Sequence, residues 1–176
     1  MNDFARERLR PMAPGILLAL AAIMFGFTLG GAFGVAEGLM KGYLEDSAQA
    51  VLEDTYDGDT DAAAAVVRKS WTYFKRAHLH ANALGTAALA ASLLLALLGP
   101  PSRLARGSGL LFGAGALVYG FFWLAAGLLA PGIGSTAAAK DALIWLAVPG
   151  SGMCTLGLAG TGICLLVRVY SGDESS

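Results

Sequence analysis

The two histidines of this chain are the residues whose type and spacing best suit chemistry, since they lie two positions apart in the segment KRAHLHANALG. Imidazole is the commonest transition-metal ligand, so His78 and His80 suggest a copper, zinc or haem site. In a helix, positions i and i+2 are about 200° apart, so the two rings cannot face the same neighbour. His78 and Asn82, one turn apart, do share a face. A metal or cofactor site would therefore combine one histidine with Asn82 or with groups from other helices. The alternative is that both rings only form hydrogen bonds at an interface.

A second pattern lies in the first apolar run, where glycine recurs at every fourth position, at Gly26, Gly30, Gly34 and Gly38. This spacing predicts a groove along one helix face that another backbone can approach closely. Glu37, the one carboxylate in this run, lies within roughly 20° of Gly26 and Gly30 around the helix axis, so we expect it to point into the groove. A carboxylate at this depth needs water or a partner. It is either an interfacial residue paired with Lys41 or with a basic residue of the second run, or it joins a histidine in a metal or proton site.

The composition indicates which elements must position these residues. Of the 176 residues, 56% are hydrophobic and 14% are charged, and the mean hydropathy is +0.61. This is too apolar for an ordinary soluble domain. Four runs reach the roughly 20 residues that a helix needs to cross a bilayer. We therefore expect an all-α polytopic membrane protein, a single four-helix bundle with spans at about 13–40, 77–98, 108–130 and 142–167.

The segment 41–76 between the first two runs is the one stretch long enough for an extramembrane feature. Leu44, Ala48 and their apolar neighbours at helical spacing lie opposite a largely acidic face, which predicts an amphipathic helix on the membrane surface or on the bundle. After the turn TYDGDTD, Thr60 or Asp61 is expected to cap a new helix that continues into the second span.

The other connections are short. Pro100 and Pro101 predict a tight turn between the second and third spans, which should pair as a hairpin. Pro131 is expected to end the third span, and Ser135 or Thr136 to cap the next helix.

The distribution of charge argues against nucleic-acid binding and suggests how the chain is oriented in the membrane. The net charge of −1 gives no basic surface for nucleic acid. With both termini inside, the positive charges divide six against six, so the overall count does not decide the orientation. Three arginines precede the first span, however, and only Lys41 directly follows it. We therefore expect an integral plasma (inner) membrane protein with both termini in the cytoplasm.

Residues 75–85 resemble the start of the second helix of haem-copper oxidase and nitric oxide reductase large subunits, where an H-x-H run precedes a glycine-containing apolar helix. This resemblance implies that His78 or His80 is an axial haem ligand. Those subunits take further histidines from later helices, and this chain has no third histidine.

The same segment is similar to the R-A-H-x-N-x-x-E signature of the membrane-associated eicosanoid and glutathione metabolism family, four-span trimers that bind glutathione. Arg76, Ala77 and His78 match in order. His80 stands at the asparagine position, Asn82 comes two residues late, and the closing glutamate is absent.

Three functions follow as hypotheses. The small size, the glycine-rich contact faces and the few polar intramembrane groups favour an accessory or structural subunit, whose partners are lipids and either further copies or a larger membrane complex. The first alternative is a metal- or haem-binding redox protein using His78 or His80 with Glu37. The second is a glutathione-linked four-span enzyme.

Overall fold

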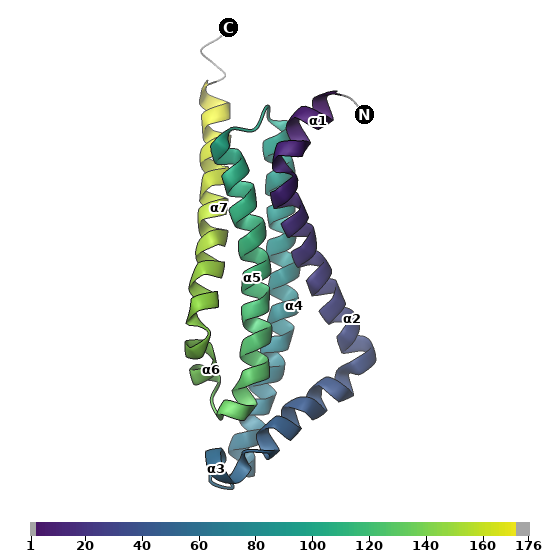
Figure 1. The fold of residues 1–176 in the computed structure, drawn as a ribbon, viewed down its shortest axis with the longest axis vertical. Coiled ribbons are helices and arrows are strands. Elements are labelled where there is room, and N and C mark those ends of the chain that lie inside the picture. Colours follow the sequence, from purple (N-terminus) through teal and green to yellow (C-terminus); the bar gives the residue numbers. More distant parts are fainter. Residues whose placement is uncertain (1–2, 172–176) are drawn as a thin grey trace.

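The computed structural model describes residues 3–171, with side chains for residues 6–170, and every regular element in this range is a helix (Figure 1). In chain order the elements are α1 (Asp3–Leu9), the 3-10 helix η1 (Arg10–Met12), α2 (Ala13–Gln49), α3 (Leu52–Tyr56), α4 (Thr60–Leu97), α5 (Arg103–Ile133), α6 (Thr136–Ala142) and α7 (Ile144–Ser171). The prediction of an all-helical fold is confirmed.

Four helical stretches in the described part of the chain are long and apolar enough to cross a membrane, and each corresponds to one predicted span. They are Arg6–Gln49, Thr60–Leu97, Arg103–Ile133 and Ile144–Tyr170. We call the end of the molecule that carries α1, the α4–α5 connection and the last turns of α7 the terminal end (Figure 1). The opposite end, with α3 and α6, is the distal end.

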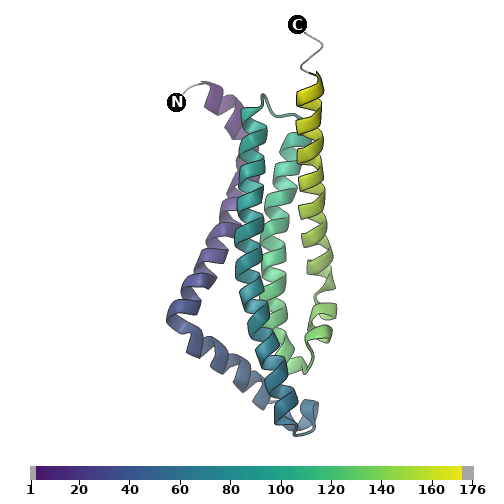
Figure 2. The ribbon, with the colours of Figure 1, turned by 180° about the vertical axis from the view of Figure 1, so that it is seen from behind.

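The four long helices do not form a closed ring in which each contacts two neighbours. Helices α2, α4 and α5 pack against one another, whereas α7 packs mainly on α5. As a result α2 and α7 lie at the two edges of the molecule, with α4 and α5 between them (Figures 1 and 2). The expected bundle is thus a three-helix unit with a fourth helix added on α5.

Glycines on several sides of α5 make this arrangement possible. A Cβ added to Gly113 would lie 2.6 Å from the carbonyl oxygen of Gly15 in α2, and one added to Gly115 would lie 2.6 Å from the backbone nitrogen of Cys154 in α7. Toward α4, a Cβ on Gly127 would lie 3.0 Å from the Ser70 carbonyl oxygen. Distances this short exclude a side chain, so α5 serves as the shared contact helix because its backbone is bare where each neighbour meets it.

Helix α4 begins one residue earlier than its predicted caps suggest. The N-cap is Asp59, whose carboxylate accepts hydrogen bonds from the backbone N–H groups of Asp61 and Ala62, both at 2.9 Å. Asp59 takes this role because its backbone is extended (ψ 95°), as an N-cap requires. The helix then continues without a break to Leu97, as predicted.

Helix α5 continues through Pro131, so the prediction that this proline ends the helix is wrong. A proline lacks only its own N–H and crowds the preceding turn, so the last residues can still follow in helical geometry. The helix ends at Ile133, followed by Gly134 with a φ of 77°. Ser135, one of the two residues predicted to cap the next helix, is the N-cap of α6. Its hydroxyl oxygen accepts a hydrogen bond from the Ala138 N–H group at 3.2 Å.

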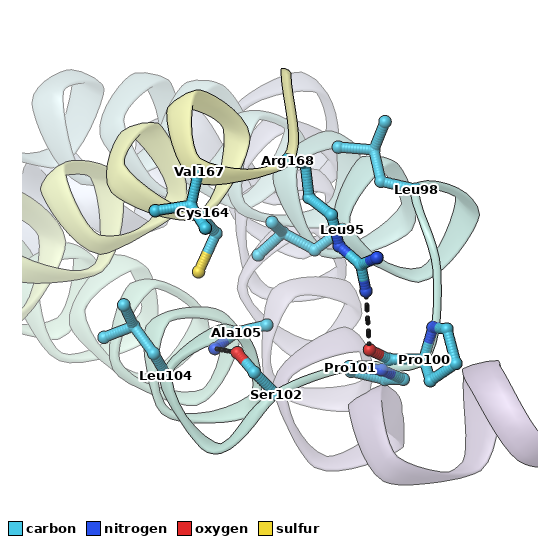
Figure 3. Close-up of a pocket in the computed structure, with 10 residues that line it drawn as sticks. All are labelled: Leu95, Leu98, Pro100, Pro101, Ser102, Leu104, Ala105, Cys164, Val167 and Arg168. Carbon is cyan, nitrogen blue, oxygen red and sulfur yellow. Dashed lines mark hydrogen bonds between the residues drawn. The ribbon is translucent and has the colours of Figure 1, made fainter. Parts of the chain in front are cut away.

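Two arginines hold the connection between α4 and α5 at the terminal end. Arg8 donates to the carbonyl oxygen of Leu97, one of the last carbonyls of α4, at 3.1 Å. Arg168 of α7 donates to the Pro100 carbonyl oxygen at 3.1 Å and lies across Gly99, whose φ of 149° favours glycine (Figure 3). A cavity of about 390 Å³ lies next to Arg168 and the α4–α5 connection, and Cys164 is one of the residues that line it (Figure 3).

Helix α2 bends at Ala36, whose φ of −133° and ψ of 19° are not helical. The helix moves away from α4 before this bend, and beyond the bend it returns to α4 near α3 (Figure 2). Its returning part buries Leu44 and Ala48, two of the apolar residues expected on one face, whereas Tyr43, expected on the same face, is 55% exposed. We call residues 37–49 the outer arm. The predicted surface helix is therefore the bent continuation of the first span rather than a separate element.

The distal end is fixed by α3. The buried Tyr56 hydroxyl donates to the carbonyl oxygen of Pro131 at 2.7 Å, which satisfies a carbonyl in the last turn of α5. Burial raises the pKa of the Tyr56 phenol above its ordinary value of 10.0, so the neutral phenol is the form that the fold favours.

The close contact of α5 with α7 gives a first testable prediction. Gly157→Ala should destabilise the protein by about 1–3 kcal/mol, because a Cβ there would lie 2.6 Å from the Phe112 backbone nitrogen. Reversible unfolding in mixed detergent micelles measures the free energy change.

Gly162→Ala on the same helix is the matched control, because nothing lies within 4 Å of the added Cβ. It should be neutral or stabilising by up to about 1 kcal/mol, the helix-propensity gain of alanine over glycine. Equal effects of the two substitutions would contradict the packing described for α7.

Candidate functional site

The two histidines lie on different sides of α4, as their spacing predicted. The His78 ring faces α2, where its centroid is 5.7 Å from that of Phe33. The His80 ring faces α5, where it lies 5.3 Å from the Tyr119 ring and 5.8 Å from the Trp123 ring, centroid to centroid. Two separate environments, rather than one bidentate site, therefore surround the imidazoles.

His78 is held in the α2–α4 contact by its Nδ1 atom, which lies 2.7 Å from the Gly26 carbonyl oxygen. A carbonyl can only accept, so Nδ1 carries the proton and donates it. Asn82 Nδ2 lies 3.2 Å from the same nitrogen, which then cannot accept from it. Turning the Asn82 amide lets Oδ1 accept from the Nδ1–H group, which it then shares with the Gly26 carbonyl oxygen, and moves the amide nitrogen to the buried position that has no partner in the described structure.

Gly26 and Gly30 provide the room for this pair. A Cβ on Gly26 would lie 2.6 Å from the Asn82 side chain, and one on Gly30 would lie 2.7 Å from the His78 ring. The predicted groove is thus occupied by two polar side chains of α4, not by a bare backbone.

The other half of the predicted groove, at Gly34 and Gly38, has no neighbour from the described part of this chain. Nothing lies within 4 Å of a Cβ placed on Gly34 or Gly38, because α2 is farthest from α4 around the bend at Ala36 (Figure 2). Glu37 accordingly does not point into a packed groove. It pairs with Lys41 one turn away, Oε1 to Nζ at 2.6 Å, and both side chains are about half exposed. Glu37 therefore forms the expected ion pair with Lys41, and it does not lie beside a histidine in the described structure.

His80 belongs to a cluster of aromatic and basic side chains between α4 and α5. Its Nδ1 lies 2.9 Å from the Arg76 carbonyl oxygen and donates to it. The Arg76 guanidinium carbon lies 4.8 Å from the centre of the Trp123 ring and 5.5 Å from that of Tyr73. These distances permit cation–π attraction, which partly compensates a charge near apolar surroundings.

Sequence reasoning missed the α5 side of this cluster. Tyr119, Trp123, Lys140 and Asp141 line a cavity of about 330 Å³ between α5 and the α6–α7 junction. The Trp123 indole nitrogen is buried and has no partner among the described residues. A signal was present, because Tyr119 and Trp123 are one helical turn apart, as are Arg76 and His80.

Both histidines use Nδ1 to donate to a carbonyl, which leaves Nε2 as the lone-pair nitrogen. This is the arrangement that orients metal-binding histidines in proteins. The described part of the chain, however, brings together no group of three or more histidine, cysteine, aspartate or glutamate side chains that could hold a metal ion. The two cysteines, Cys154 and Cys164, are buried and unpaired with each other.

No protein-family model matches the sequence, and no curated protein or solved structure is significantly similar to the chain.

The hydrogen bonds of the two rings can be tested directly. We expect the ¹⁵N spectrum of histidine-labelled protein at about pH 8.5 to show both imidazoles as the Nδ1–H tautomer, although Nε2–H is the common form in water. His78→Ala assigns the two sets of signals. A dominant Nε2–H signal from either ring would contradict the contacts with the Gly26 and Arg76 carbonyl oxygens.

Proposed function

We propose that this protein is an integral membrane protein of four spans that serves as an accessory or structural subunit of a larger membrane assembly. In this proposal it lies in the plasma (inner) membrane with both termini in the cytoplasm. Four sufficiently long apolar helices support the membrane placement. Arg6, Arg8 and Arg10 before the first span support the orientation.

The observation that carries the subunit proposal is the uncovered face of α2 around its bend. A Cβ on any of four glycines would have nothing within 4 Å, and these are Gly31, Gly34, Gly38 and Gly42. Val35 and Leu39 between them are 91% and 80% exposed. In α5, Gly113 and Gly115 each admit the backbone of a second helix. The bent region offers the same kind of surface with nothing from its own chain covering it.

Energetics favour a partner for this surface. Glycine in a helix is less favourable than alanine by about 1 kcal/mol, and four of them in one stretch gain nothing from packing within this chain. The half-exposed Glu37–Lys41 pair on the same arm also gains from a polar neighbour if it lies at the edge of the hydrocarbon region. A helix of another subunit supplies both contacts, and lipid tails supply neither.

A photo-crosslinking experiment tests the proposal in native membranes. Benzoylphenylalanine replaces Val35, and we expect a discrete protein adduct after irradiation because a partner helix covers this position. Mass spectrometry of the adduct identifies the partner, and co-expression of two differently tagged copies shows whether it is another copy of this chain.

Leu156 on α7, 64% exposed, is the control position and should give only lipid adducts. Protein adducts at Val35 no stronger than those at Leu156 would reject the subunit proposal.

Orientation has its own test. We expect Asp57→Cys, exposed in the turn after α3, to react in intact cells with a thiol reagent that does not cross the membrane. The buried Cys154 and Cys164 should stay unlabelled, so the parent chain is the background control. Labelling only after permeabilisation would place the distal end in the cytoplasm, which is the arrangement that the glutathione-linked alternative requires.

A metal- or haem-binding function remains the second candidate, because each imidazole keeps its Nε2 lone pair while Nδ1 is fixed on a carbonyl. Glu37 was the expected third group, but it pairs with Lys41 instead, so a complete ligand set needs donors from a second copy or a partner. Stoichiometric metal or a Soret band in protein purified from metal-replete membranes would favour this candidate over the structural one.

A further inference from the structure

A cavity of about 690 Å³ opens at the terminal end, between the N-terminal helical segment and α4. It has two kinds of wall. Arg6 and Arg10 line the charged part of the cavity. The remainder is aliphatic and comprises Leu9, Ala13, Ile16, Leu17 and Leu93.

The side chains that line the cavity change from charged to aliphatic along the axis of the N-terminal helix. The helical path is continuous from Arg6 into α2. Arg6, Arg10, Ala13 and Leu17 recur at intervals of three or four residues, so they share one face. Going from Arg10 to Leu17, a rise of about 10 Å, the groove changes from charged to aliphatic. A ligand that fits it must have an anionic end and a long apolar part.

The two guanidinium groups are available to such a ligand. Arg6 and Arg10 are exposed, and among the described residues neither forms an ion pair or a hydrogen bond through its side chain. Arg8, by contrast, donates to the Leu97 carbonyl oxygen, and Arg168 to that of Pro100. Among the residues whose side chains are described, Glu7 is the neighbouring carboxylate; it lies about 100° from Arg6 around the helix, and although it is one turn before Arg10 it forms no ion pair with it.

We propose that this groove binds an anionic phospholipid, with its phosphate at Arg6 and Arg10 and one acyl chain along Leu17 and Leu93. Guanidinium groups pair with phosphate oxygens in bidentate geometry, and the acyl chain covers aliphatic side chains that would otherwise line an open groove. The inference rests on the proposed membrane placement, in which this end faces the leaflet that carries most anionic lipid.

Native mass spectrometry tests the proposal on the full-length protein released from nanodiscs of equal parts phosphatidylglycerol and phosphatidylcholine. Wild-type protein should retain phosphatidylglycerol preferentially. Arg6→Gln with Arg10→Gln should weaken its retention by about 25-fold, from roughly a fivefold loss for each arginine. Leu93→Trp, which fills the groove and keeps both charges, should also reduce it.

The matched control is Arg103→Gln with Arg106→Gln, which removes the same charge from exposed positions at the same end outside the groove. It should leave the preference unchanged. Equal losses in the two double variants would show bulk charge attraction and overturn the proposal, as would equal retention of both lipids by wild type. Loss of the bound species on adding inorganic phosphate alone would indicate a phosphate site rather than a lipid site.

These results are independent of the subunit proposal, because bound lipid is counted on the single chain. Lipid retention without a crosslink at Val35 rejects only the subunit function, and the reverse result rejects only the lipid groove.

Discussion

Close approach of helix backbones at α5 is the constraint on which the rest of the structure depends. Where α5 lacks side chains, at Gly113, Gly115 and Gly127, it touches α2, α7 and α4 in turn. In the proposed membrane placement the hydrophobic effect gives little drive for helices to associate, so such contacts provide much of the attraction through dispersion. The arrangement of three packed helices with α7 on the outside follows from where these glycines fall. The same packing leaves one face of α2 and one face of α7 without a neighbour from the chain.

Much of the fold could be predicted from the sequence, because long apolar runs and cap residues are local signals. The four helices, the continuous α4 and the Ser135 cap all agree with such signals. The separation of His78 from His80 also followed from helix geometry alone. The bend at Ala36 was not predicted, because no proline marks it and the flanking Gly34 and Gly38 were interpreted as part of a packing groove. Spacing likewise suggested one continuous groove, whereas the bend divides the glycines between a packed and an open part.

The candidate site shows the same limit. Sequence identified the histidines, Glu37 and Asn82 by residue type, but not which of them meet. Asn82 and His78 do meet, because one helical turn is a fixed distance, and Glu37 meets Lys41 for the same reason. Contacts across helices, such as Arg76 over Trp123, depend on the rotation of each helix, which no local pattern sets. Among the described residues the two ends also differ in charge, because Arg6, Arg10 and Arg168 lie at the terminal end and most of the acidic residues lie toward the distal end.

The bend in α2 has a geometric origin. Gly30 lies against His78, and Ala48 packs in one cluster with Ala63. Between these two attachments, α2 is about three residues longer than the opposing part of α4, an excess of about 4.5 Å. Two rods of unequal length that are joined at both ends cannot both stay straight, so the longer one buckles outward. The number of residues between the two contacts therefore determines how far α2 bends away from α4. The identity of the residues determines only where along α2 the bend lies.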